Sequence, residues 1–93
     1  DVLWIEAEDY YVLVHTRRDR HLLRMSMASL EERLDPRTFV RTHRAAIVNV
    51  REIAQVDPGC VSLVLSDGTR VAISRSRREG VERLVRACLN HAI

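Results

Sequence analysis

The chain has 93 residues and a mass of 10.7 kDa, a length that suits one domain spanning residues 1–93 and is too short for two. Hydrophobic residues make up 46% and charged residues 30%, with two prolines and three glycines, which excludes a disordered chain, a linker and a repetitive fibre. The formal net charge of +2 identifies no partner by itself, and the apolar runs fall well short of the roughly 20 residues of a membrane span.

The first part of the chain predicts three strands. Residues 2–8 and 11–16 are rich in β-branched, aromatic and other apolar side chains, which favours two strands joined by the short connection 9–10. Residues 17–20 are polar and charged and predict a turn. Residues 21–25 then predict a third strand returning beside the second.

A short helix is predicted next, followed by more extended segments. Ser26 suits the helix N-cap, and apolar residues recur at spacings of three and four until Asp35-Pro36, where the helix ends because the residue before proline avoids helical backbone. Asp67-Gly68 predicts a two-residue type I′ hairpin turn. The segments predicted to be extended are residues 39–41, 45–50, 53–56, 61–66 and 70–74.

The last element is predicted to be the longer helix. Ser76 and Glu79 have the spacing of a capping box. A single apolar stripe then follows at helical spacing, formed by Val81, Leu84, Val85, Cys88, Leu89 and Ala92. The sequence therefore predicts a mainly β fold of short antiparallel sheets, similar to a β-sandwich, with one short helix and a C-terminal helix.

No residue pattern favours catalysis, a metal or a cofactor. A metal site needs convergent ligands, and the histidines are scattered; His15 and His21 can face each other across a turn but have no third ligand. The chain has no Gly-x-Ser-x-Gly elbow and no glycine-rich phosphate loop. We therefore expect no catalytic residue, no metal and no cofactor. Cys60 and Cys88 are expected to be reduced thiols of a cytoplasmic protein, with a single bridge between them left open.

The pattern of positive charge is more informative than its total. All 15 cationic side chains are arginines, which bind phosphate and guanine well. Most of them lie in three basic segments, residues 11–24, 38–51 and 70–78, and the two stretches between these segments are net acidic. In the third segment the arginines precede a predicted helix, where cations are unfavourable and anions are favoured, so this segment predicts a phosphate site. The alternative is that Ser76 only caps the helix and the arginines are solvated.

Several short motifs follow one another along nearly the whole chain. They are Trp4-Ile5-Glu6-Ala7, Tyr11-Val12, Leu30 with Leu34, Phe39-Val40-Arg41-Thr42-His43-Arg44 running into Ile47-Val48-Asn49, Ile53, Asp67-Gly68 and Ile73-Ser74-Arg75. In this order they resemble the LytTR DNA-binding domain of bacterial response regulators. The resemblance implies a cytoplasmic domain that binds promoter direct repeats in double-stranded DNA and bends them. It also implies that loops, rather than a recognition helix, enter successive major grooves.

The resemblance also implies roles for particular residues. Base contacts fall on Tyr10, Arg44 and Arg75, and the residues suited to the DNA backbone are Arg41, His43, Ser74, Arg77 and Arg78. Asn49 belongs to the motif and is expected to form a structural turn. The chain departs from the family at Ala45-Ala46, where a serine and an aromatic residue are common, which removes one hydroxyl contact.

The resemblance further implies that this chain is part of a longer protein. The strand that usually precedes Trp4 is missing, and the chain opens directly on a strand-like run, so we expect a domain cut from a longer protein that carries an upstream receiver or other sensor domain. Binding is expected as a dimer on direct repeats, formed through the full-length protein, without membrane contact. An alternative function is a protein-interaction or dimerisation module in which the C-terminal apolar stripe docks a partner. A third, RNA binding, has only Tyr10 and Tyr11 as stacking residues.

Overall fold

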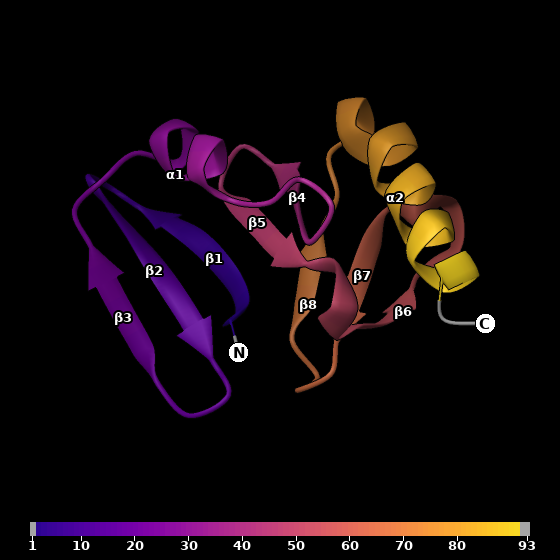
Figure 1. The fold of residues 1–93 in the computed structure, drawn as a ribbon, viewed down its shortest axis with the longest axis horizontal. Helices are drawn as coiled ribbons and strands as arrows, with labels where there is room; N and C mark the ends of the chain where they lie inside the picture. The colour runs from indigo at the N-terminus through magenta and orange to yellow at the C-terminus, as the bar shows by residue number, and fades with distance from the viewer. Residues whose placement is uncertain (1, 92–93) are drawn as a thin grey trace.

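The structure of the chain is a computed structural model that describes residues 2–91, with side chains described as far as Cys88. Its strands form two antiparallel sheets, and Figure 1 shows them side by side, with the N-terminal strands at one end and the C-terminal helix at the other. This confirms the predicted mainly β fold of short antiparallel sheets with one short and one C-terminal helix.

The larger sheet has the strand order β3-β2-β1-β5-β4, with β1 (Val2–Glu8), β2 (Tyr11–Thr16), β3 (Arg20–Leu23), β4 (Phe39–His43) and β5 (Ala46–Asn49). The smaller sheet has the order β6-β7-β8, with β6 (Ile53–Val56), β7 (Ser62–Leu65) and β8 (Arg70–Ala72). The helices are α1 (Met27–Arg33) and α2 (Arg78–His91), and the three short 3-10 turns are η1 (Val50–Glu52), η2 (Pro58–Cys60) and η3 (Arg75–Arg77). Within the described residues, neither helix is long and apolar enough to cross a membrane.

Two groups of buried side chains hold these elements together. The first joins both sheets to α2 and contains Leu3, Ala46, Val48, Cys60, Leu63, Leu65, Val71, Ile73 and Val81. The second joins the larger sheet to α1 and contains Ile5, Val12, Met27, Leu30 and Ile47. Strand β5 supplies residues to both groups, because alternate residues of a strand point to opposite faces of the sheet. The continuous apolar run that predicts this strand is therefore buried on both faces.

Asn49 ends β5 and starts the connection to the smaller sheet. Its side chain is buried, its Nδ2 donates to the carbonyl of Val2 at 2.9 Å, and its Oδ1 accepts from the amide of Arg51 at 3.0 Å. One side chain thus holds the start of β1 against the first turn of η1. This confirms the structural role predicted for Asn49.

Replacing Asn49 with alanine is expected to lower the free energy of unfolding by about 1–3 kcal/mol, because the carbonyl of Val2 and the amide of Arg51 lose their part-buried hydrogen bonds. Urea denaturation followed by circular dichroism measures the loss. Gln55 in β6 is a matched amide with an exposed side chain, and Gln55→Ala should change stability by no more than about 0.5 kcal/mol. Equal losses in the two variants would contradict the role assigned to Asn49.

Two of the predicted local motifs are wrong. A type I′ turn needs positive φ at both central residues, and in the β7–β8 hairpin only Gly68 has it, at 92°. The amide of Gly68 donates to the carbonyl of Leu65, so the loop is longer and ends on a left-handed glycine. The predicted capping box does not form either. Ser76 lies inside η3, whose N-cap is Ser74, and the carboxylate of Glu79 binds Arg83 at 3.1 Å.

For other predicted elements, the structure changes or confirms the residue at which the element begins or ends. The third strand ends at Leu23 rather than Met25, because the amide of Met25 turns back to the carbonyl of Leu23 and the Met25 side chain packs on the second core group. Ser26 caps α1 as predicted, accepting from the amide of Ser29 at 3.0 Å. Of the apolar stripe on α2, the Leu89 side chain and Ala92 lie outside the part that the structure describes.

The two cysteines do not pair with each other. Cys60 is buried and Cys88 is half-buried, and both are free thiols, so the bridge left open above is not formed. Burial raises the pKa of the Cys60 thiol, which keeps it in the protonated, unreactive form.

Candidate nucleic-acid interface

Three connections lie along one side of the molecule, at the top of Figure 1: the β1–β2 turn, the β4–β5 turn and the segment from β8 into α2. The sheet register accounts for the first two. Strands β1 and β5 run antiparallel with Glu6 opposite Ala46, and the amide of Ala7 donates to the carbonyl of Ala45 at 2.9 Å. The end of β1 therefore lies beside the start of β5, and the turns that carry Tyr10 and Arg44 share one end of the larger sheet.

Tyr10 stands out on the β1–β2 turn. The turn is two residues long, with Asp9 in left-handed backbone at φ 55°, a conformation that aspartate tolerates better than most residues. Tyr10 is 83% exposed and does not pack on the sheet. This position suits a contact with another molecule.

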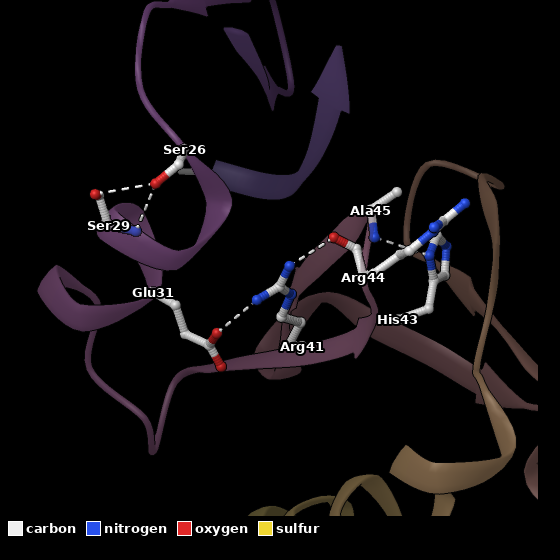
Figure 2. Close-up of polar contacts among 7 residues, drawn as sticks. All are labelled: Ser26, Ser29, Glu31, Arg41, His43, Arg44 and Ala45. Carbon is white, nitrogen blue, oxygen red and sulfur yellow. Dashed lines mark hydrogen bonds and ion pairs between the residues drawn. The ribbon is translucent and has the colours of Figure 1, made fainter. Parts of the chain in front are cut away.

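Arg44 lies on the β4–β5 turn, whose backbone forms two hydrogen bonds with side chains of β4. Figure 2 shows its polar contacts: the amide of Ala45 donates to Nδ1 of His43 at 3.1 Å, and a guanidinium nitrogen of Arg41 donates to the carbonyl of Arg44 at 2.7 Å. Because Nδ1 accepts, neutral His43 carries its proton on Nε2, where it can donate to an acceptor outside the chain. The Arg44 side chain is exposed.

The segment between β8 and α2 is fastened to β4. The amide and the hydroxyl of Ser74 both donate to the carbonyl of Thr42, at 2.9 and 3.3 Å, and the amide of Arg77 donates back to the carbonyl of Ser74 at 2.9 Å. Thr42 precedes His43, so the bond holds the Arg75 segment beside the Arg44 turn although the two come from different sheets. Arg75 itself is exposed.

The resulting surface is positively charged. Burial, reinforced by the charges of Arg41, Arg44 and Arg77, lowers the pKa of His43 below its ordinary value of 6.5. In the described part of the chain, Arg44, Arg75, Arg77 and Arg78 form no ion pair with a carboxylate, in contrast with Arg41 and with Arg83 on α2. The arrangement can therefore receive an anion without first breaking a salt bridge at these four positions.

The lowered pKa of His43 predicts a stability that falls in mild acid. Between the ordinary pKa and the lower folded value, the unfolded chain binds more protons than the folded one, so stability decreases as the pH falls through this window. His43→Asn keeps an acceptor for the Ala45 amide and removes this titration. The loss of unfolding free energy from about pH 7.5 to about pH 5.5 in urea should be smaller in the variant. Asp35, Asp57 and Asp67, whose pKa values are also lowered, titrate below this window. An unchanged pH dependence would contradict the assignment.

The structure thus gathers Arg41, His43, Arg44, Ser74 and Arg77 within one region, with Tyr10 on a neighbouring turn. Arg78 begins α2 beside Cys60, whose Sγ donates to its carbonyl at 3.8 Å. The DNA contacts assigned to these eight residues, Arg75 included, remain predictions. Sequence reasoning missed Glu31 of α1, which binds Arg41 at 3.0 Å. No motif signals this pair, because it joins two separate elements.

His15 has a different role from the one considered for a metal site. The strand register places His21 opposite Val14, so the two histidines do not face each other. His15 instead stacks on Trp4, with ring centroids 4.6 Å apart, and its Nε2 lies 2.7 Å from a carboxylate oxygen of Glu6. The cluster links β1 to β2 beside the first core group, against which Trp4 packs.

Comparison with known proteins gives one consistent result. The model of the LytTr DNA-binding domain family matches residues 1–86. The heme-containing CO-sensing transcriptional regulator RcoM 1 of Paraburkholderia xenovorans is 36% identical over 90 residues, covering 91% of this chain and 33% of that protein. The sensory transduction protein LytT of Bacillus cereus is 27% identical over 89 residues, covering 92% of this chain and 36% of that protein.

A solved structure agrees with these sequence matches. It is the LytTr DNA-binding domain of a putative methyl-accepting/DNA response regulator from Bacillus cereus, with 29% identity and a TM-score of 0.81 over 90% of this chain and 80% of that one. The chain spans about a third of the length of the curated relatives that it matches.

Proposed function

The chain belongs to the LytTR family of DNA-binding domains, and we propose that it binds double-stranded promoter DNA in a sequence-specific manner. The observation that carries the proposal is the convergence of Arg44 and Arg75, both exposed and without carboxylate partners in the described chain, from two different sheets onto one side of the molecule. A hydrogen bond from Ser74 to the carbonyl of Thr42 holds the two segments together.

The chemistry of each side chain determines whether it is assigned to a phosphate or to a base. The Nε2–H of His43 and the side chains of Ser74, Arg77 and Arg78 bind phosphate oxygens and set the orientation on the duplex. Arg44 and Arg75 extend into the major groove, where a guanidinium can donate to both O6 and N7 of a guanine. Bending of the DNA towards the domain increases the number of such contacts.

The dimensions of the molecule suit contacts in successive grooves. Its longest axis is 36 Å, about one helical turn of B-DNA, and α2 occupies one end of this length. The three connections are spread along this axis in Figure 1. The β1–β2 turn lies at one end of this row, and its Tyr10 is assigned to a groove next to the one read by the arginines.

The domain works within a longer protein. The relatives above are transcriptional regulators and sensory transduction proteins from bacteria, and the chain covers about a third of each. We therefore assign residues 1–93 as one DNA-binding output domain without catalytic function, in a cytoplasmic regulator whose other part receives the signal. The full-length protein pairs two such domains on promoter direct repeats, without membrane contact from this domain.

The interaction-module alternative is less well supported. In that function the apolar stripe of α2 docks a partner, but Val81 is buried in the first core group and Val85 packs against it. The helix therefore already uses this face to cover the sheets. Size-exclusion chromatography with and without DNA separates the two functions.

The test of the proposed function is selection from a pool of randomised duplexes, followed by fluorescence anisotropy of the selected DNA across a salt series. We expect an enriched repeat and a linear fall of log K with log salt concentration, as each neutralised phosphate releases counterions. Weak binding without any enriched sequence would contradict the proposal.

A further inference from the structure

Arg41 differs from the other arginines of the interface because its guanidinium is already bound. One terminal nitrogen donates to the carboxylate of Glu31 in α1 at 3.0 Å, and the other donates to the carbonyl of Arg44 at 2.7 Å, as Figure 2 shows. The side chain is only 16% exposed. Because little of this side chain is exposed and both terminal nitrogens are bonded within the chain, Arg41 is poorly placed to bind a phosphate.

The bond to Arg44 is part of a larger arrangement around one peptide group. The carbonyl of Arg44 and the amide of Ala45 belong to the same planar unit. Arg41 holds the oxygen of this unit, and Nδ1 of His43 holds its N–H at 3.1 Å. Two side chains of β4 thus fix the orientation of the peptide plane between Arg44 and Ala45. Because this plane is attached to the α-carbon of Arg44, its orientation also sets the direction in which the Arg44 side chain leaves the turn.

Glu31 completes the arrangement from α1. Its carboxylate neutralises the half-buried guanidinium and keeps the planar fork of Arg41 aimed at the turn. Arg41 also has a buried Nε without a hydrogen-bond partner in the structure, so the side chain is held by its two terminal nitrogens.

We propose that Glu31 and Arg41 are positioning residues for base readout: they orient the Arg44 turn and do not themselves bind DNA. The proposal rests on the proposed function and replaces the backbone contact that the family resemblance implies for Arg41. It makes Glu31, an acidic residue near a DNA-binding surface, favourable for specific binding.

The two roles of Glu31 predict opposite signs for Glu31→Gln. If its charge only repels DNA, its removal strengthens binding to every duplex. If it positions Arg44, the variant binds the selected duplex more weakly, by about five-fold or more, while binding to random DNA does not fall. Glu32→Gln is the matched control on α1, since Glu32 is exposed and forms no ion pair within the described residues.

Arg41→Lys provides the second arm of the experiment. Lysine keeps the positive charge but not the two-armed fork, so a phosphate contact survives the change whereas positioning does not. We expect loss of discrimination at the base pair read by Arg44, an unchanged salt slope, and a circular dichroism spectrum and unfolding midpoint close to those of the wild type. If Glu31→Gln behaves as Glu32→Gln does, and Arg41→Lys retains base preference, the inference is wrong while the proposed function stands. If the wild type selects no sequence, the proposed function fails first.

Discussion

Arg75→Ala is expected to weaken binding to the selected duplex by about 5–150-fold, the equivalent of the 1–3 kcal/mol that one bidentate arginine–guanine contact contributes to discrimination. Binding to random DNA should change much less, because a base contact adds little where no guanine is in register. The expected signature is loss of preference at one base pair. Anisotropy titrations against the selected duplex and its single-base variants measure it.

The turn at the other end of the larger sheet offers a control for this prediction. Arg18 lies on the exposed β2–β3 turn, away from the three connections in Figure 1, and it binds Thr16 through its backbone amide rather than its side chain. Arg18→Ala therefore removes one exposed arginine without changing the turn. If Arg75→Ala weakened selected and random DNA equally, the base-reading role of Arg75 would be wrong.

The double variant Arg77→Ala/Arg78→Ala is expected to weaken binding to all duplexes alike. These residues are assigned to phosphates, and each lost phosphate contact lowers the slope of log K against log salt by about 0.9, so the pair should lower it by about 2. The base preference of the remaining complex should not change. Parallel salt titrations of wild type and variant measure the two slopes.

Two outcomes would contradict this assignment. A salt slope equal to that of the wild type would place both arginines away from the DNA backbone. A loss confined to the selected duplex would make them base contacts instead. The adjacent Arg75→Ala variant serves as the comparison, since it is expected to change base preference with a smaller effect on the slope.

The individual strands could be predicted because their side-chain patterns are local. Leu63 and Leu65 alternate with less buried residues and form β7, while the uninterrupted apolar run at Ile47 and Val48 forms a strand buried on both faces. The assignment of each strand to one of the two sheets could not be predicted. Periodicity reports which face of a strand is buried, whereas the pairing of β1 with β5 joins segments about 40 residues apart.

The start of α2 illustrates how a tertiary contact overrides a local motif. Ser76 and Glu79 have the spacing of a capping box, but the bond from Ser74 to the carbonyl of Thr42 fixes the chain two residues earlier. A 3-10 turn begins there, and Ser76 falls inside it. No local sequence pattern predicts this hydrogen bond, because Thr42 belongs to a strand in the other sheet.

The position of the site could be predicted from the sequence, but the contacts of its side chains could not. The segments around Arg44 and Arg75 are conspicuous as basic stretches beside apolar strands, so charge and family resemblance lead to the same places. The state of each arginine depends on its neighbours in space. Arg41 and Arg44 belong to one motif, yet only the fold brings Glu31 to Arg41 and leaves Arg44 exposed.

In the proposed complex, turns from both sheets, rather than a helix, face the DNA. The most direct measurement is a titration of the isotopically labelled chain with a selected duplex, followed through its backbone amide resonances. We expect the largest shifts on the β1–β2 turn, the β4–β5 turn and residues 74–78. Largest shifts along the length of α2, or on the β2–β3 turn around Arg18, would contradict it.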